Sequence, residues 1–416
     1  MEKIGVFVAG GPAAGINGVI KGLVQEADNS SLRVLGFLAG AHGLVHGRFV
    51  QLTREMVEDI QVRGGSILGT SRFRITGDAD VAKIVAHLRE ENVEGLVSIG
   101  GEGTLQLADR LRQAGVHIVH VPKTIDNDIE GVEQTFGFDT AVHVSARMLT
   151  AIKLDAQSSG LWFVVEIMGR FTGHLALEAG LASGCTRVLI PEAGHIDVDE
   201  LAALVEARTK IGLNWGVILV AESAHFGEGH ITRHGRLGGV SEVLADRLEV
   251  ATAALGCTTK VRTSNLGYFL RCPEPTGFDR SYGAKLGLGA ACFMQDPSRS
   301  GQMVTVVNDR FCGVPMESVA GKMKPVSLEG VRYQTLCSFA RYESARADLE
   351  AQQLVRQRAG HTLQWLDAHA TPDTIAEVAM RLGIGTDTLL EVLQDMAGSI
   401  QPVLDPSAPD AVDAPL

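Results

Sequence analysis

The sequence predicts an α/β protein of two lobes, each a mainly parallel sheet flanked by helices with a cleft between them, followed by a helical C-terminal extension. Three observations carry this prediction. Short apolar runs rich in β-branched residues alternate with helical patterns, as strands buried on both faces alternate with the helices that cover them. The runs end in Gly, Asp or Glu, which is typical of ligand-binding loops in α/β proteins. The strand–helix units are too numerous for one sheet, which indicates two.

The individual elements follow from this alternation. Because helices join successive strands, parallel pairing is expected. The expected strands are IGVFVAGG (4–11), VEGLVSIGGEG (93–103), VHIVHVPKT (116–124), LWFVVEIMGR (161–170), TRVLIPE (186–192) and WGVILVAES (215–223). The expected helices include AAGINGVIKGLVQEA (13–27), DADVAKIVAHLREENV (78–93) and DVDELAALVEARTKIG (197–212).

The pattern changes past about residue 345 and becomes wholly helical. Residues 346–403 are expected to form a helical extension, with Gly383 and Gly385 as a break between helices. Part of this extension resembles a helix-turn-helix, but it lacks the basic face that DNA binding requires. The tail 404–416 is rich in Pro, Ala and Asp and is expected to be disordered.

The composition argues against several classes of function. The 416-residue chain has a formal net charge of −12, which disfavours binding to a nucleic-acid backbone. It has no apolar run of about 18 residues that would span a membrane. The N-terminus enters a predicted strand at once, and the six cysteines form no CxxC pair. We therefore expect a cytoplasmic protein with reduced thiols, without nucleic acid or membrane as a partner.

Three glycine-containing loops suit phosphate binding. In GGPAAGIN (10–17) the glycines allow the backbone to approach an anion at a helix N-terminus. The segment RGGSILGTSR (63–72) offers hydroxyl groups and two guanidinium groups for phosphate oxygens. In IGGEGT (99–104) Glu102 follows a strand, where a carboxylate holds Mg²⁺ beside a polyphosphate.

A fourth loop, PKTIDND (122–128), carries the acid–base chemistry. Asp126 and Asp128 alternate along an extended stretch, with Thr124 on the same side. Phosphoryl transfer to an alcohol needs a carboxylate that accepts the hydroxyl proton while nearby cations neutralise phosphate charge. Any one of these loops alone is equally typical of a solvated turn. The four together, in this order, predict a phosphotransferase.

The ordered motifs resemble those of the 6-phosphofructokinases over roughly residues 1–340. Eight motifs occur in family order and near-family spacing: GGPAAGIN, GGSILGTSR, GGEGT, PKTIDND, GFDTA (137–141), VVEIMGR (164–170), VAE (220–222) and LGYFLR (266–271). The resemblance implies two α/β lobes with the active site in the cleft, within a catalytic region at 1–345. A donor lobe would comprise 1–138 and 255–300, and an acceptor lobe 139–254 and 301–345.

The resemblance also implies roles for individual residues. Asp126 would take the proton of the sugar 1-hydroxyl, Thr124 and Asp128 would orient the reactants, and Arg170 would balance charge on the transferring phosphoryl group. Glu102, usually Asp in the family, would bind Mg²⁺. The donor-binding set would be Gly11, Arg72, Phe73, Gly101, Gly103, Thr104 and Lys123; the sugar-phosphate set would be Met168, Gly169, Glu222, Arg262, Tyr268 and Arg271.

The identity of the donor depends on a few positions. In the family, a glycine at Gly103 leaves room for the α-phosphate of ATP, whereas pyrophosphate users tend to carry Asp there. Lys123 is typical of pyrophosphate users but also occurs in one ATP-using branch. Pro12 and Leu107 favour pyrophosphate. The combination resembles the mixed, ATP-using branch, and pyrophosphate stays open as the donor.

The acceptor end departs from the family pattern. Leu161 stands where the family has an arginine that reaches in from a neighbouring subunit. We expect a Mg²⁺-dependent kinase that transfers phosphate from ATP to the 1-hydroxyl of fructose 6-phosphate, in a homodimer or homotetramer with shared active sites. Pyrophosphate as the donor, another sugar or polyol as the acceptor, and a non-catalytic regulatory protein that binds phosphometabolites remain alternatives.

Overall fold

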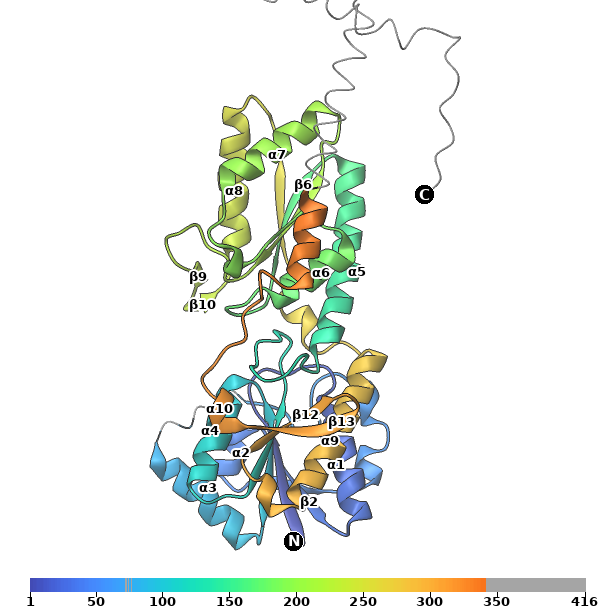
Figure 1. Cartoon of the computed structure of the whole chain (residues 1–416), viewed down its shortest axis with the longest axis vertical. Helices are drawn as coiled ribbons and strands as arrows, with labels where there is room; N and C mark the ends of the chain where they lie inside the picture. Colours follow the sequence, from blue (N-terminus) through green and yellow to red (C-terminus); the bar gives the residue numbers. More distant parts are fainter. Residues whose placement is uncertain (72, 74, 76, 342–416) are drawn as a thin grey trace, which may run out of the picture. The chain divides into compact units, whose positions relative to one another are not determined.

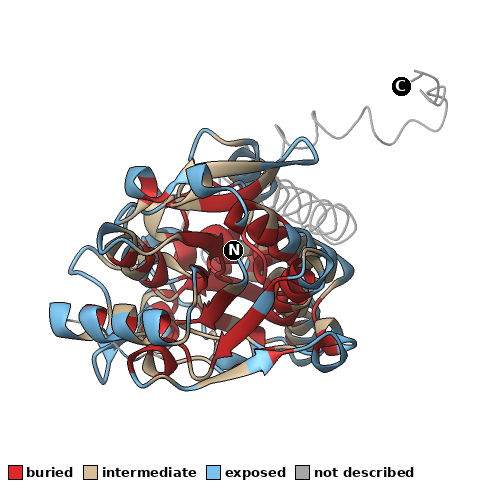
Figure 2. Cartoon of the chain, turned by 90° about the horizontal axis from the view of Figure 1, so that it is seen from below, coloured by how far each residue is buried: buried red, intermediate tan, exposed pale blue. Residues whose placement is uncertain are grey.

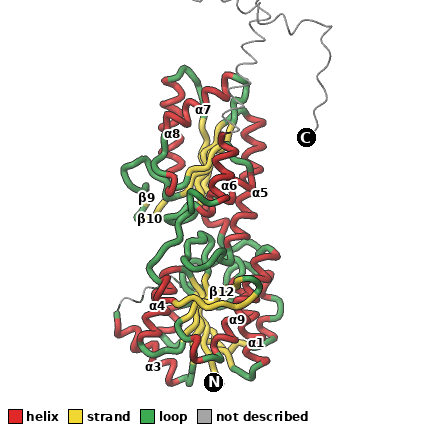
Figure 3. Tube along the Cα trace, in the orientation of Figure 1, coloured by secondary structure: helices red, strands yellow, loops and turns green. Residues whose placement is uncertain are grey.

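Two mainly parallel sheets organise the described residues, which are 1–71, 73, 75 and 77–341 of a computed structural model (Figure 1 and Figure 3). These residues belong to one compact unit, Met1–Glu343. The predicted α/β class with two helix-flanked sheets is confirmed. The predicted extension 346–403 and tail 404–416 lie outside the described residues, as does Arg72.

The larger sheet has seven strands in the order β13-β12-β5-β4-β1-β2-β3. The strands from β12 to β2 are parallel, and the edge strands β3 and β13 are antiparallel to their neighbours. In chain order the strands are β1 (Lys3–Val8), β2 (Arg33–Phe37), β3 (Phe49–Leu52), β4 (Gly95–Gly100), β5 (Ile118–Pro122), β12 (Gln302–Val307) and β13 (Arg310–Pro315).

Helices cover both faces of the larger sheet because its strands alternate apolar side chains between the two faces. In β1, Ile4, Val6 and Val8 pack with one set of helices, and Phe7 packs with the other. The first set is α1 (Ile16–Asn29) and α9 (Gly277–Met294); the second is α2 (Ala41–Val45), α3 (Asp78–Glu90), α4 (Glu102–Gln113) and the short α10 (Met316–Val319).

Helices α1 and α9 pack backbone against backbone. A Cβ atom at Gly22 would lie 2.2 Å from the carbonyl oxygen of Ala284, and one at Gly287 would lie 2.1 Å from that of Val19. Only glycine fits such a close approach. This packing fixes the position of α1, and with it the GGPAAGIN loop that leads into the helix.

The smaller sheet has four parallel strands in the order β11-β6-β8-β7. They are β6 (Trp162–Ile167), β7 (Arg187–Leu189), β8 (Gly216–Ala221) and β11 (Val261–Asn265). One face packs against α5 (Phe138–Ser159) and α6 (His174–Ser183), and the other packs against α7 (Val198–Lys210) and α8 (Val240–Ala254). The remaining short elements are the hairpin β9 (Thr232–Arg233) and β10 (Arg236–Leu237), and the 3₁₀ helices η1 (Glu55–Val57), η2 (Ile60–Val62), η3 (Pro191–Ala193), η4 (Gly267–Leu270) and η5 (Pro297–Arg299).

The buried carboxylate of Asp279 in α9 anchors the start of α5. It accepts hydrogen bonds from the backbone N–H groups of Gly137 and Thr140, both at 2.8 Å, and from the Thr140 hydroxyl. A carboxylate at a helix N-terminus satisfies donors that the helix leaves unpaired. Because α5 runs on to pack against the smaller sheet, Asp279 ties the two sheets together.

The predicted lobe boundaries need correction at three strands. Residues 255–300 were assigned to the first lobe, but β11 within that range joins the smaller sheet through pairing with β6. Residues 301–345 were assigned to the second lobe, but β12 and β13 extend the larger sheet beyond β5. The polar strand β11 leads directly into η4 and α9, so the chain returns to the larger sheet only after Asn265, later than the predicted boundary at 255.

Burial follows the sheets, since the strands lie inside a layer of helices whose outer faces are exposed (Figure 2). Trp162, Phe7 and Phe37 are among the largest fully buried side chains. Within the described part of the chain, none of the helices combines the length and the hydropathy needed to cross a membrane.

Candidate active site

The PKTIDND loop follows β5 and buries its polar side chains. Thr124, Asp126 and Asp128 are 8%, 7% and 3% exposed. The Thr124 hydroxyl donates to Oδ2 of Asp126 at 3.2 Å and accepts from the Asp126 backbone N–H at 3.0 Å. Oδ1 of Asp126 and Oδ1 of Asp128 are buried without a protein partner. Buried carboxylate oxygens without partners are costly, which favours a role toward a ligand.

The loops after β6 and β8 face these aspartates from the smaller sheet. Nη1 of Arg170 lies 3.6 Å from Oδ2 of Asp128. Oε1 of Glu222 accepts from the backbone N–H groups of Gly169, at 3.2 Å, and Arg170, at 2.8 Å. Arg170 has φ of 52°, a left-handed conformation that is uncommon for a non-glycine residue and concentrates at functional sites. Met168 is half-buried directly after β6.

The carboxyl groups of Asp126, Asp128 and Glu222 have raised pKa values. Burial, with smaller contributions from the charges of Asp128 and Glu222, raises the pKa of Asp126 to about 7, and Arg170 and Thr124 oppose this rise. Burial also raises the pKa values of Asp128 and Glu222. A carboxyl group with a pKa near neutrality is suited to act as a general base at physiological pH.

The larger sheet places Gly11, Gly101, Thr104 and Lys123 of the predicted donor set together at the ends of β1, β4 and β5. The ammonium group of Lys123 donates to the carbonyl oxygen of Gly11 and lies 3.5 Å from where a Cβ on Gly10 would sit. The Thr104 hydroxyl lies 3.9 Å from the same point, and a Cβ on Gly101 would lie 3.4 Å from the carbonyl oxygen of Lys123. Burial lowers the pKa of Lys123 to about 8, so the lysine remains mostly charged at pH 7.

Gly103, another residue of the predicted donor set, has free space around it. It is exposed, and a Cβ atom placed on it would meet no atom within 4 Å. The absence of a side chain there leaves free space beside the donor loops.

Phe73 belongs to an aromatic cluster that the sequence analysis missed. Its ring packs edge-on against His42 and His46, with centroids 5.6 Å and 6.3 Å away, and the two imidazoles stack at 4.2 Å. The cluster lies near the first loop, because the Gly10 backbone N–H donates to the carbonyl oxygen of Ser71 at 3.1 Å. The i, i+4 spacing of the histidines in AHGLVH was the available signal.

Two hydrogen bonds hold the carboxylate of Glu102. Its Oε1 accepts from the Gly321 backbone N–H at 3.1 Å and from the Gln106 side chain, and its charge acts on Asp128. Among the described residues there is no cluster of three or more His, Cys, Asp or Glu side chains that would form a metal site. Mg²⁺ in phosphoryl-transfer sites uses one or two carboxylates and completes its shell with phosphate and water. Glu102 and Asp128, with its unpartnered Oδ1, fit that description.

The two arginines of the predicted sugar-phosphate clamp occupy different places. The guanidinium carbon of Arg271 lies 3.7 Å from where a Cβ on Gly11 would sit and 4.5 Å from the centre of the Tyr268 ring. Its charge acts on Lys123 and Glu222. Arg262, by contrast, is exposed on β11, an edge strand, next to the start of β6 where Leu161 is half-buried. The structure thus brings Arg271 to the central site and leaves Arg262 at an edge.

The chain is similar in sequence to known phosphofructokinases. A family model described as Phosphofructokinase matches residues 3–294. The chain is 36% identical over 346 residues to an ATP-dependent 6-phosphofructokinase of Corynebacterium efficiens, an alignment that covers 79% of this chain and 96% of that protein. It is 35% identical over 343 residues to a pyrophosphate–fructose 6-phosphate 1-phosphotransferase of Amycolatopsis methanolica, with coverage of 80% and 98%.

The fold is likewise similar to solved structures. A pyrophosphate-dependent phosphofructokinase of Marinobacter aquaeolei superposes with a TM-score of 0.70 at 19% identity, covering 82% of this chain and 91% of that chain. A phosphofructokinase of Saccharomyces cerevisiae gives a TM-score of 0.69 at 23% identity, covering 84% and 48%.

Proposed function

The chain belongs to the phosphofructokinase family of phosphotransferases, and we propose that it transfers a phosphoryl group from ATP to the 1-hydroxyl of fructose 6-phosphate. The observation that carries this proposal is Asp126, buried with an unpartnered Oδ1 and a pKa raised to about 7. It lies between the donor loops of one sheet and the loops of Arg170 and Glu222 from the other.

Asp126 acts as the general base. Its carboxylate takes the proton of the sugar 1-hydroxyl, the hydroxyl oxygen bonds to the γ-phosphorus, and the bond to the bridging oxygen breaks to release ADP. The hydrogen bond from Thr124 fixes the orientation of the carboxylate. Asp128 and Glu222 hold Arg170 by its side chain and its backbone, so that the guanidinium group neutralises charge on the transferring phosphoryl group.

Lys123 and Arg271 flank the Gly11 backbone. Lys123 is placed to bind donor phosphate oxygens, and Arg271 keeps its predicted role as a contact to the sugar phosphate. Mg²⁺, bound by Glu102 and Asp128, would neutralise charge on the donor phosphates. The remaining predicted contacts to the sugar phosphate are Met168, Gly169, Tyr268 and Arg262.

ATP is favoured over pyrophosphate by two features of the site. Free space at Gly103 accommodates the α-phosphate of a nucleotide. The exposed Phe73 ring, packed against His42 and His46, offers an aromatic surface for a base near the donor loops. Pyrophosphate remains the second candidate donor, because a relative that is 35% identical bears a pyrophosphate-dependent name.

The proposal extends to the compartment and the oligomeric state of the enzyme. We propose a cytoplasmic homo-oligomer with shared active sites. All six cysteines are free thiols, as a reducing compartment requires. Arg262, exposed on an edge strand, is placed to complete the sugar-phosphate site of a neighbouring subunit.

A donor-by-acceptor matrix tests the proposal. ATP and pyrophosphate are each combined with fructose 6-phosphate, sedoheptulose 7-phosphate and a panel of unphosphorylated sugars and polyols, with Mg²⁺ present. We expect the highest kcat/KM for ATP with fructose 6-phosphate. Turnover with another acceptor alone would show that Leu161 marks a changed specificity, and no turnover with any pair would favour a non-catalytic protein.

A further inference from the structure

The segment 321–324 contacts the loop of Glu102 and the PKTIDND loop, although both lie far from it in the sequence. The backbone N–H of Gly321 donates to Oε1 of Glu102 at 3.1 Å, and that of Lys324 donates to the carbonyl oxygen of Asp128 at 3.0 Å. Met323 forms an isolated antiparallel bridge with Ile129. The segment is therefore aligned along the end of the PKTIDND loop.

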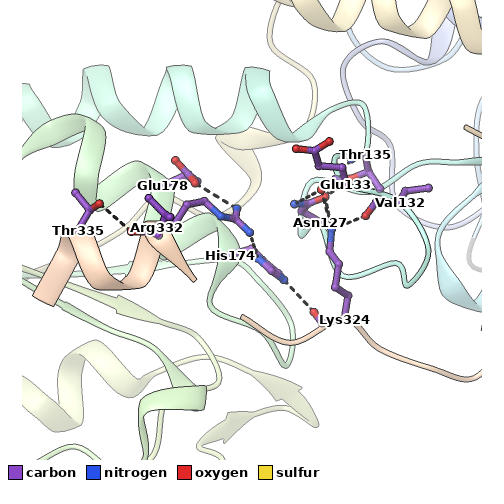
Figure 4. Close-up of polar contacts among 10 residues, drawn as sticks. Asn127, Val132, Glu133, Thr135, His174, Glu178, Lys324, Arg332 and Thr335 are labelled. Carbon is purple, nitrogen blue, oxygen red and sulfur yellow. Dashed lines mark hydrogen bonds and ion pairs between the residues drawn. The ribbon is translucent and has the colours of Figure 1, made fainter. Parts of the chain in front are cut away.

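The side chain of Lys324 reaches into the same loop (Figure 4). Its ammonium group donates to Oδ1 of Asn127 at 3.2 Å and to the carbonyl oxygens of Val132 and Glu133, both at 2.9 Å. An ammonium group has three protons to donate, and these three acceptors use them all. Burial lowers the pKa of Lys324 to about 8, so the ammonium form still dominates at pH 7.

The position of Asn127 determines where the two neighbouring aspartates lie. Asn127 lies between Asp126 and Asp128, is 1% exposed, and has φ of 54° in the left-handed region. Its side-chain oxygen also accepts from the backbone N–H of Thr135 at 3.0 Å. Asn is one of the few non-glycine residues that adopt this conformation readily. The hydrogen bonds from Lys324 and Thr135 fix the Asn127 side chain in this turn between the two aspartates.

One side of the loop borders a cavity of about 270 Å³, which is lined by Asn127, Glu133 and Gln134 of the loop and by Arg332. Elsewhere the loop is held by the buried side chains of Ile129 and Val132. The hydrogen bonds of Lys324 therefore add polar contacts to the part of the loop that borders the cavity.

Lys324 also joins the loop to the smaller sheet (Figure 4). Nε2 of His174 in α6 donates to the carbonyl oxygen of Lys324 at 2.9 Å. Nδ1 of His174 then accepts from Arg332 at 3.4 Å, and Arg332 pairs with Glu178 at 3.2 Å. Burial lowers the pKa of His174 to about 4, which keeps the imidazole in the neutral form that this pattern requires.

We propose that Lys324 is a positioning residue for phosphoryl transfer: its ammonium group holds Asn127, and thereby sets the carboxylates of Asp126 and Asp128 relative to the loop of Arg170. The inference rests on the proposed function. Lys324 does not contact the reacting atoms, so its loss should misplace the base without removing a substrate contact.

The test compares the full-length wild type with Lys324→Met, which keeps the aliphatic stem and removes the three donors, and with Lys324→Arg, which keeps the charge. Lys322→Met is the matched control, because Lys322 is an exposed lysine two residues away. We expect Lys324→Met to lower kcat by about 10- to 100-fold, the size expected when a catalytic group is misplaced, with both KM values within twofold. Lys324→Arg should recover part of the loss, and Lys322→Met should match the wild type.

Hydrogen exchange of the backbone amides in 124–135 separates this inference from the proposed function. In Lys324→Met we expect faster exchange in that segment, with the rest of the chain unchanged, whether or not a substrate has been identified. Unchanged exchange in 124–135, or faster exchange with kcat within twofold of the wild type, would overturn the inference. A uniform rise in exchange with a matching loss of Tm would also overturn it, since Lys324 would then only stabilise the fold. Inactive wild-type protein would instead refute the proposed function.

Discussion

At the scale of single residues, Asp126 combines two properties that oppose each other. Its carboxylate has an unpartnered oxygen and is surrounded by Asp128 and Glu222, which makes it an effective base but an unfavourable charge to bury. Active sites are commonly built at such a cost in stability. The effect of Asp126 on catalysis and its effect on stability can be measured separately.

Replacing Asp126 with Asn should abolish most of the activity while stabilising the fold at alkaline pH. Loss of the base should lower kcat by about 10²- to 10⁴-fold with little change in KM. The pKa of Asp126 is about 7 in the folded protein, above its value of about 4 in an unfolded chain. Charging this group therefore removes stability as pH rises from about 4 to about 7.

The measurement is Tm against pH for the wild type and Asp126→Asn, together with steady-state kinetics. The Tm of the variant should exceed that of the wild type at pH 8, and the difference should shrink toward pH 5. A kcat near that of the wild type would exclude Asp126 as the base.

Gly103 gives a residue-scale test of the donor. Asp at this position fits the free protein, because a Cβ there meets no atom within 4 Å. Its charge and bulk would repel an α-phosphate, so Gly103→Asp should lose ATP-dependent turnover and spare turnover with pyrophosphate. Gly103→Ala, which adds a methyl group alone, is the control and should retain ATP use. Equal loss with both donors would contradict the steric explanation.

At the scale of elements, the sequence motifs predicted the strands whose ends form the site. The expected strands correspond to β1, β4, β5, β6, β7 and β8, because each combines β-branched apolar residues with a glycine or acidic end. The polar strand β11 and the strands β12 and β13 were not predicted, and their assignment to the lobes was wrong, because pairing partners are set by tertiary contacts.

The same limit applies to the candidate site. Residues within one motif, such as Thr124 and Asp126, were found because their relation is local. The hydrogen bond between Lys324 and Asn127 spans 197 residues of sequence. Neither residue has a neighbouring pattern that would reveal the contact.

The contact between α1 and α9 provides a test at this scale. Gly22→Ala should destabilise the protein by about 1–3 kcal/mol or more, since the added methyl group would overlap the Ala284 carbonyl group. This loss would occur although alanine favours a helix by about 1 kcal/mol relative to glycine. Gly277→Ala, in α9 where a Cβ meets no atom within 4 Å, is the matched control and should be neutral. Equal Tm values for the two variants would contradict the packing described here.

At the scale of the whole molecule, the two sheets together set the electrostatics of the site. Burial between the sheets raises the pKa of Asp126 most, the charges of Asp128 and Glu222 raise it further, and Arg170 lowers it. Lys123 contributes the opposite charge at the donor end, with a pKa of about 8. The proposed mechanism requires the charged forms of both Asp126 and Lys123, which coexist over a narrow range of pH.

The activity should therefore depend on pH with two limbs. We expect kcat/KM to rise with pH through about 7, as Asp126 loses its proton, and to fall above about 8, as Lys123 loses its own. Glu222→Gln removes a like charge from the surroundings of Asp126 and should move the acid limb to lower pH. An acid limb at the same pH in this variant would contradict the assignment of that limb to Asp126.

The central claim is phosphoryl transfer from ATP to the 1-hydroxyl of fructose 6-phosphate, and ³¹P NMR of a reaction mixture tests it most directly. The full-length protein is incubated with Mg²⁺, ATP and fructose 6-phosphate, and the phosphorus signals are followed over time. We predict that signals of ADP and of a new phosphate ester at C1 of the sugar grow at equal rates. Unchanged ATP, or a new ester at any other position, would contradict the claim.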